Sequence, residues 1–270
     1  MSPGQRAEAR IAELGIRDPK DLDVEAIAFD AGVSVRYAPL IGCEATLVGF
    51  GARAIATIRP SPVRGRERFS IGHELAHWEL HRGRSFRCGV DDPSLNLESN
   101  VMLEREADEF ASHLLMPKPL FNPVVRQFKY PTVAQIQEVA EAFQTSQAAT
   151  MIRLAKVDTL PVIIACYSLE KRLWLCAAAH VPRRWQLKSK LDADSFAHEF
   201  LTRGTPALVP RKQSADAWFD NDDAEKYELL EQCVPGMPGR VLVTLYLSDD
   251  EMFDAEHDRD VVFRWKKRHV

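Results

Sequence analysis

Two histidines and a glutamate in the stretch FSIGHELAHWELHRG have the types and spacing of a metal-dependent hydrolytic site. His73 and His77 are four residues apart in a predicted helix, so both imidazoles lie on one face and can bind one metal ion. Glu74 follows the first histidine directly and lies beside that ion without having to bind it. A carboxylate in that place can take a proton from a metal-bound water. We therefore predict His73 and His77 as metal ligands and Glu74 as the catalytic base.

A third ligand is needed, because a catalytic zinc site uses three protein ligands and keeps a fourth position open. The next predicted helix, 99–115, contains Glu104, Glu106 and Glu109. Helical spacing places Glu104 on one stripe with two alanines, whose small side chains let another helix approach closely. Glu106 and Glu109 point more towards solvent. We favour Glu104 as the third ligand and keep Glu106 as the alternative.

Two further residues belong to the surroundings of this predicted site. Asp108 lies one turn from Glu104, where it can accept a hydrogen bond from the ring N–H of a ligating histidine. His81 continues the four-residue series, but it lies roughly 12 Å from His73 on an axis that rises 1.5 Å per residue. That distance argues against a third histidine ligand. A place with Arg82 in the last turn, at the negative end of the helix dipole, is favoured for His81.

Local signals predict the elements that must position these residues. Ser61 and Pro62 have the types of an N-cap and a first helical residue, and Gly51 places two strands in a hairpin. Zinc hydrolases with such a helix bind an extended peptide as an added strand, for which 52–58 is the predicted exposed edge. Helices are predicted at 5–14, 24–31, 61–82 and 99–115, and strands at 33–40, 44–50 and 52–58.

The chain changes character near residue 158. Residues 133–143 and 146–157 have the spacing of a helix-turn-helix, but the second helix carries only Arg153 and Lys156 as basic residues. DNA-reading helices are normally more basic, so a structural or substrate-docking role is favoured over DNA binding. Short strands are predicted beyond residue 160, at 162–169, 173–181, 207–210 and 240–247. The predicted fold is α+β: a zincin-like domain at 1–128 with a three-stranded sheet, a helix-turn-helix-like adaptor at 129–158, and an α+β domain at 159–270.

The composition is that of a globular protein and excludes several classes. The chain has 270 residues, with 35 Lys and Arg against 39 Asp and Glu, a net charge of −4. Such a chain lacks the overall basic character that non-specific nucleic-acid binding requires. The N-terminus has no signal-peptide core, and the longest apolar runs are far shorter than the roughly 18–20 residues that span a bilayer. Five scattered cysteines form no C-x-x-C pair, so we expect a reducing, cytoplasmic setting.

Beyond these local patterns, HELAHWELH followed by EREADEFASHLLMP resembles the ImmA/IrrE family of bacterial metallopeptidases. The resemblance extends over roughly 20–157, including the helix-turn-helix-like pair. It implies that His73, His77 and Glu104 bind the metal and that Glu74 is the catalytic base. Asp108 stands where the family commonly has Asn or Asp. On the example of one family member, the domain at 159–270 is interpreted as GAF-like and regulatory or sensory.

The resemblance also implies a substrate class. We expect a cytoplasmic zinc-type endopeptidase, able to use manganese or iron, that cleaves a helix-turn-helix repressor and so relieves repression of stress-response or mobile-element genes. The alternative is a DNA-binding or partner-binding regulator with a structural metal site. The substrate, its cleavage site, the activating signal, the oxyanion-stabilising residue and the oligomeric state are left open by the sequence.

Overall fold

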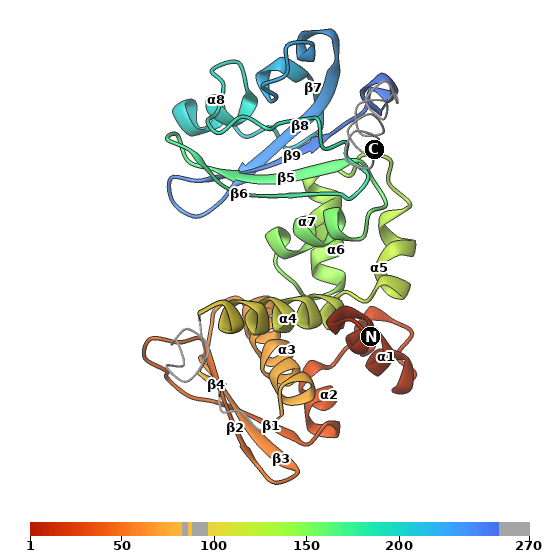
Figure 1. Ribbon diagram of the computed structural model, residues 1–270, viewed down its shortest axis with the longest axis vertical. Coiled ribbons are helices and arrows are strands. Elements are labelled where there is room, and N and C mark those ends of the chain that lie inside the picture. Colours follow the sequence, from red (N-terminus) through yellow and green to blue (C-terminus); the bar gives the residue numbers. More distant parts are fainter. Residues whose placement is uncertain (83–85, 88–96, 254–270) are drawn as a thin grey trace, which may run out of the picture. The chain divides into compact units, whose positions relative to one another are not determined.

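A computed structural model describes residues 1–82, 86–87 and 97–253 of the chain. These residues form two compact units, which are considered separately (Figure 1). The first unit contains Met1–Val124 and Glu138–Thr150, and the second contains Val125–Gln137 and the residues from Met151 onward. The segment 129–158, predicted as an adaptor, contributes residues to both units. In the described part of the chain no helix is long and apolar enough to cross a membrane.

The first unit contains a sheet with the strand order β1-β3-β2-β4. The three predicted strands all form, and the two-residue β4 adds to β2. The predicted edge strand, 52–58, is wrong as an edge, because β3 lies between β1 and β2 and pairs with both. Ala54, Ala56 and Ile58 of this strand are all buried, as expected for a central strand. The strands are β1 (Val33–Tyr37), β2 (Ala45–Phe50), β3 (Arg53–Ile58) and β4 (Phe86–Arg87).

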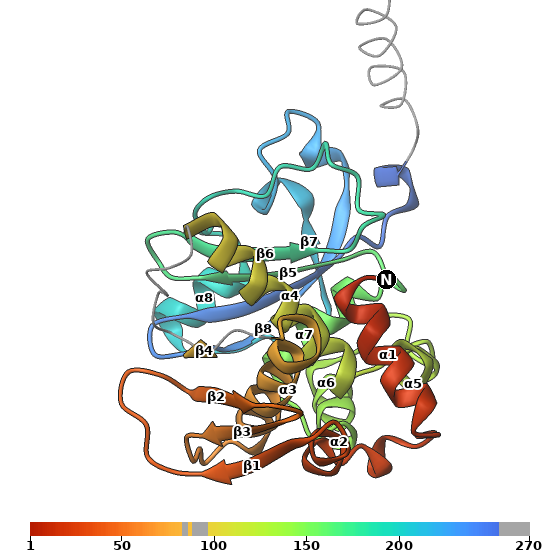
Figure 2. The same cartoon turned by 60° about the horizontal axis from the view of Figure 1, so that its bottom comes forward.

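Helices pack on this sheet and on one another (Figure 2). The helices that begin in the first unit are α1 (Pro3–Glu13), α2 (Val24–Asp30), α3 (Arg64–Leu80), α4 (Leu97–Leu115) and α5 (Lys118–Val125). Trp78 of α3 packs over Gly49 of β2, where a Cβ atom would stand 3.0 Å from the ring. The same indole donates a hydrogen bond to the Ala31 carbonyl at 2.9 Å. These contacts fix α3 against the sheet.

The two long helices α3 and α4 approach closely at small residues. A Cβ atom on Gly72 of α3 would lie 3.4 Å from both Cα and Cβ of Ala111 on α4. Ala107, one turn earlier on α4, is fully buried. The absence of larger side chains at these positions lets the backbones come together, as the alanine stripe predicted. Glu104 is on the same face of α4, so this close approach brings its carboxylate to α3.

Helix α1 connects the ends of α3 and α4. Arg6 of α1 donates to Glu79 near the end of α3 at 2.9 Å, and Glu8 bonds to His113 near the end of α4 at 2.7 Å. Glu79 is almost buried, so the ion pair is shielded from solvent on one side. These contacts hold the two helices that carry the predicted site in one arrangement.

The start of α3 differs from its prediction. The helix begins at Arg64 with Val63 as its N-cap, two residues later than Ser61 and Pro62 indicated. Ser61 is used locally instead: its hydroxyl accepts from the Val63 amide at 3.1 Å, and its own amide donates to Glu67 at 2.8 Å. The serine therefore forms a turn before the helix and does not cap it.

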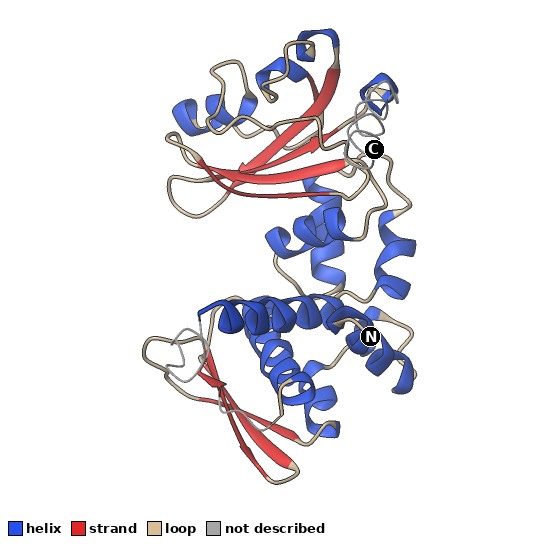
Figure 3. Cartoon of the chain, viewed as in Figure 1, coloured by secondary structure: helices blue, strands red, loops and turns tan. Residues whose placement is uncertain are grey.

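The second unit is an antiparallel sheet with helices around it (Figure 3). Its strand order is β6-β5-β9-β8-β7, and all neighbours are antiparallel. The strands are β5 (Val162–Tyr167), β6 (Arg172–Ala177), β7 (Arg211–Ser214), β8 (Glu228–Pro235) and β9 (Val241–Tyr246). The other helices are α6 (Val133–Ala142), α7 (Gln147–Lys156) and α8 (Phe196–Arg203). Every residue of β5 and β9 is buried, so these two strands form the middle of the core.

Candidate metal centre

Three side chains from α3 and α4 converge on one point. The Nε2 atoms of His73 and His77 are 3.1 Å apart. Glu104 places Oε2 at 3.1 Å from His73 Nε2 and Oε1 at 3.5 Å from His77 Nε2. Tetrahedral zinc, with bonds of about 2.0–2.1 Å, holds its ligand atoms about 3.3 Å apart. The three donors therefore have the spacing and the chemistry of a zinc-type site.

The protonation states of these groups also suit a metal ion. Burial lowers the pKa of the His77 imidazole, because desolvation disfavours its charged form. Hydrogen bonds from His73 and then from His77 hold the pKa of Glu104 well below its usual range. Neutral imidazole and ionised carboxylate are the forms that bind metal. The shifts thus favour a neutral His77 and an ionised Glu104.

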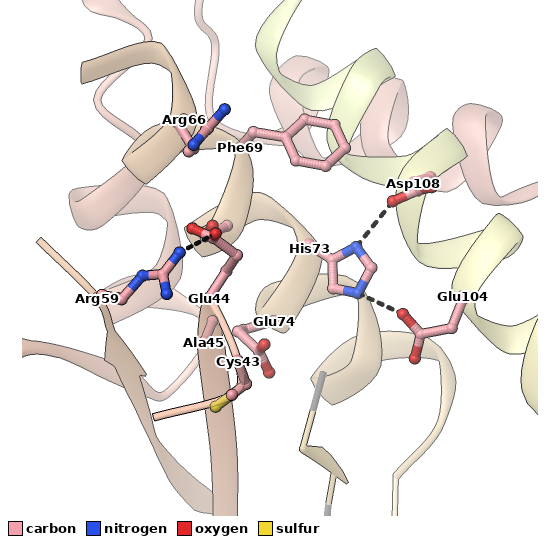
Figure 4. A pocket seen from close by; sticks show the side chains of 12 residues that line it. Cys43, Glu44, Ala45, Arg59, Arg66, Phe69, His73, Glu74, Glu104 and Asp108 are labelled. Atoms are coloured by element: carbon pink, nitrogen blue, oxygen red, sulfur yellow. Dashed lines mark hydrogen bonds and ion pairs between the residues drawn. The ribbon is translucent and has the colours of Figure 1, made fainter. Parts of the chain in front are cut away.

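Asp108 lies where the helical stripe predicted it. Its Oδ1 atom is 3.0 Å from Nδ1 of His73, while Nε2 of the same ring faces Glu104 (Figure 4). A carboxylate on Nδ1 holds the proton there and leaves Nε2 free to bind a metal. Asp108 thus has the geometry of an orienting group for His73.

Glu74 is fully buried and lines the same cavity as His73 and Glu104. The cavity has a volume of about 440 Å³ and opens beside the three converging side chains. A carboxylate in this place is within the compartment that a substrate carbonyl and a water would share. The cavity is lined by Gly42, Cys43, Glu44, Ala45, Arg59, Arg66, Phe69, Ser70, His73, Glu74, Glu104 and Asp108.

The wall across the cavity from α4 was not predicted. Glu44 and Arg59 form an ion pair at the ends of the hairpin strands, and Arg59 also donates its amide to the Glu44 carbonyl at 2.9 Å (Figure 4). The register Ala45–Ile58 makes these two residues the next pair outside the hairpin. The pairing of Glu44 with Arg59 could have been predicted by counting residues outward along both strands from the turn at Gly51. Arg66 and Phe69, two turns and one turn before the first histidine on α3, complete this side.

His81 lies at the end of α3 as predicted, but its contacts with His77 and Glu106 were not predicted. His81 follows α3 as its C-cap, with a backbone that has left the helical region (φ −124°, ψ 35°). Its Nδ1 atom is 3.0 Å from Nδ1 of His77, and its Nε2 atom is 2.9 Å from Oε2 of Glu106. Glu106 contacts His81 and is not among the three converging residues. The ring thus lies between a predicted ligand and a carboxylate, a role that spacing along an ideal helix could not indicate.

The fold and the converging side chains define a metallopeptidase-like domain: an H-E-x-x-H helix on a mixed sheet, with a glutamate of the following helix beside the two histidines. Residues 30–155 match the family model described as the IrrE N-terminal-like domain. This part of the chain is thus similar to the IrrE N-terminal-like domain.

The comparison with solved structures extends beyond this domain. The fold is similar to that of a solved Mycobacterium tuberculosis transcriptional regulator, with a TM-score of 0.59 and 16% identity. That similarity covers 90% of this chain and 86% of the other. A search of curated proteins found no match. The likeness to the solved structure is one of fold.

Proposed function

We propose that the protein is a metal-dependent endopeptidase whose catalytic base is Glu74. The observation that carries this proposal is the convergence of His73, His77 and Glu104 beside a cavity that also contains Glu74. Zinc fits the donor set, and manganese or iron can bind such a set as well. When bound, the metal polarises the scissile carbonyl and lowers the pKa of water.

The residues of the chain then have separate tasks. Glu74 takes the proton of the attacking water and delivers it to the leaving amine, as its burial beside the ligands allows. His73 and His77 remain neutral donors, and Asp108 orients the first of them. The segment Gly42–Ala45 borders the cavity and leads into β2, so an extended peptide can bind along it.

The substrate we propose is a cytoplasmic helix-turn-helix repressor, whose cleavage relieves repression of stress-response or mobile-element genes. The match of residues 30–155 to a peptidase-family model supports a protein substrate, and the fold-level similarity is to a protein described as a transcriptional regulator. Within the described residues Cys43, Cys166, Cys176 and Cys233 are free thiols, which is typical of a reducing compartment.

The central experiment compares two glutamate-to-glutamine variants of α3. Glu74→Gln removes the base but keeps the shape of the side chain, so it should retain metal and lose cleavage of a co-expressed helix-turn-helix repressor. Glu67→Gln is the matched control, because Glu67 lies on the same helix and accepts from the Ser61 amide, an acceptor that glutamine preserves. Cleavage by Glu74→Gln at the wild-type rate would contradict the proposed base.

A second candidate function is a DNA-binding regulator with a structural metal site, as the transcriptional-regulator similarity invites. The second helix of the helix-turn-helix-like pair, α7, argues against it: Arg153 is fully buried, so Lys156 is the exposed basic residue of that helix. Phosphate contacts require several exposed cations. A duplex-DNA titration over a salt series separates the two functions, since a steep loss of affinity with salt would favour the regulator.

A further inference from the structure

The two histidines of the metal centre are supported in different ways. His73 has a carboxylate, Asp108, directly on Nδ1 at 3.0 Å. His77 has another imidazole there: His81 Nδ1 lies at 3.0 Å, and Glu106 lies at 2.9 Å from the far nitrogen of His81. The His77 side chain is fully buried and that of His81 is 6% exposed, so water competes little for these contacts.

The metal centre determines where the protons lie in the hydrogen-bonded series His77, His81 and Glu106. His77 Nε2 faces Glu104 and His73, so a metal at that point requires a lone pair on Nε2. The proton of a neutral His77 must then be on Nδ1, from which it is donated to His81 Nδ1. A neutral His81 that accepts at Nδ1 carries its own proton on Nε2. That proton is donated to Glu106, and every polar atom in the series is satisfied.

We propose that His81 and Glu106 are positioning residues that fix the tautomer and the ring orientation of His77 for metal binding. They do for His77, through one additional imidazole, what Asp108 does for His73 directly. A carboxylate behind a ligating histidine orients the ring and raises its basicity. Neither residue touches the metal or the substrate. The inference rests on the proposed metal centre and adds a role for two residues outside it.

The hydrogen-bonded series His77–His81–Glu106, or relay, lies at the end of α3. Residues four apart on a helix are neighbours, so His81 is next to His77 as His77 is next to His73. The helix ends at Leu80, and the His81 backbone is no longer helical. Glu106, from α4, lies at the other side of the ring.

Two amide substitutions at His81 separate the two links of the relay. In His81→Asn the amide oxygen can occupy the position of Nδ1 and still accept from His77, while the link to Glu106 is lost. In His81→Gln the amide nitrogen can occupy the position of Nε2 and reach Glu106, while the link to His77 is lost. Glu106→Ala removes the carboxylate, and Glu109→Gln is its control on the same helix, since Glu109 accepts from the Gly4 amide.

The readout is the zinc dissociation constant, measured by competition with a chelator on the full chain. We expect His81→Gln to weaken zinc binding about 10- to 100-fold, the range for residues that orient a ligand. His81→Asn should weaken it less, Glu106→Ala should weaken it, and Glu109→Gln should not. In two-bond ¹H–¹⁵N spectra of the zinc-loaded protein, a slowly exchanging Nδ1 proton on His77 should be present in the wild type and lost in His81→Gln.

Three outcomes would overturn the inference. Wild-type zinc affinity in His81→Gln would show that His77 needs no support. Equal losses in His81→Asn and His81→Gln, in step with their loss of thermal stability without metal, would show a merely structural role. In both cases the wild type still binds zinc, so the proposed function survives. A wild-type protein that binds no zinc would remove the proposed function and this inference together.

Discussion

Both units of the molecule contain buried ionisable side chains, but the surroundings of these side chains differ. In the first, His73 and His77 are buried and, with the half-exposed Glu104, place three atoms that can bind a metal ion close together. In the second, Glu231 is fully buried, but its oxygens accept from the Ala197 amide and the Trp218 indole, each at 2.8 Å. Burial of an ionisable group alone therefore does not identify a site. The first unit differs because it brings three possible metal ligands from two helices to one point beside a cavity.

Metal removal should affect only the first unit. A ligand that binds the native state stabilises it by about 4 kcal/mol when its free concentration is 1,000 times the dissociation constant. We expect a chelator to increase hydrogen exchange in α3 and α4 and to leave β5 and β9 protected. Mass spectrometry of the exchanged protein reports both regions in one experiment. Loss of protection in β9 as well would show that the two units do not respond separately.

Glu231 should make the second unit lose stability as pH rises. Burial raises its pKa to about 7 from an ordinary value of 4.5, so the folded state holds the proton more tightly than the unfolded state. Its contribution is full below pH 4.5 and is lost as pH rises through 7. At 1.36 kcal/mol per pKa unit, the change is roughly 3 kcal/mol. Hydrogen exchange of β8 at pH 5 and pH 8 measures it.

Glu231→Gln is the control for this pH dependence. Glutamine cannot titrate, so the difference between pH 5 and pH 8 should shrink in β8 even though one of the two accepted hydrogen bonds is weakened. The absolute stability of the variant is not the test. An unchanged pH dependence would show that another group controls the stability of this strand.

Some residues of the candidate site could be predicted from the sequence, and others could not. His73, Glu74 and His77 could be named because their relation is local to one helix, and Glu104 because one alanine stripe orients the next helix. His81 and Glu106 could not be assigned, because their contact depends on how α3 ends. The central position of β3 was missed for a related reason: β1 pairs with it from a distance in sequence.

The second unit was harder to predict because its core contains polar residues. Strand β8 was missed, since Glu231 and Gln232 interrupt the apolar pattern although both are fully buried. Their partners come from elsewhere in the unit: Gln232 donates to the Pro131 carbonyl at 3.0 Å. The run at 207–210, predicted as a strand, has no regular structure. Periodicity detects strands whose buried face is apolar, and it fails where hydrogen bonds make a polar face acceptable.

The close approach of α3 and α4 gives a smaller, purely steric prediction. A methyl group at Gly72 would just contact Ala111, but two further methyl groups would not fit. We expect Gly72→Val to cost about 1–3 kcal/mol by overpacking and to weaken zinc binding, because it moves Glu104 away from the histidines. Gly72→Ala is the control and should preserve both. Denaturant titration and chelator competition measure the two effects, and intact zinc affinity in Gly72→Val would contradict the coupling.

The smallest expected effect separates helix capping from burial in the second unit. Ser195 caps α8 by accepting from the His198 amide at 3.2 Å, next to the Ala197 amide that Glu231 binds. Ser195→Ala should cost about 1 kcal/mol, the usual loss for an N-cap. Its stability should still fall between pH 5 and pH 8 as in the wild type, because Glu231 keeps its burial and its donors. Loss of the pH dependence in Ser195→Ala would contradict this expectation. It would show that the raised pKa of Glu231 depends on an ordered start of α8 and not on desolvation within the sheet.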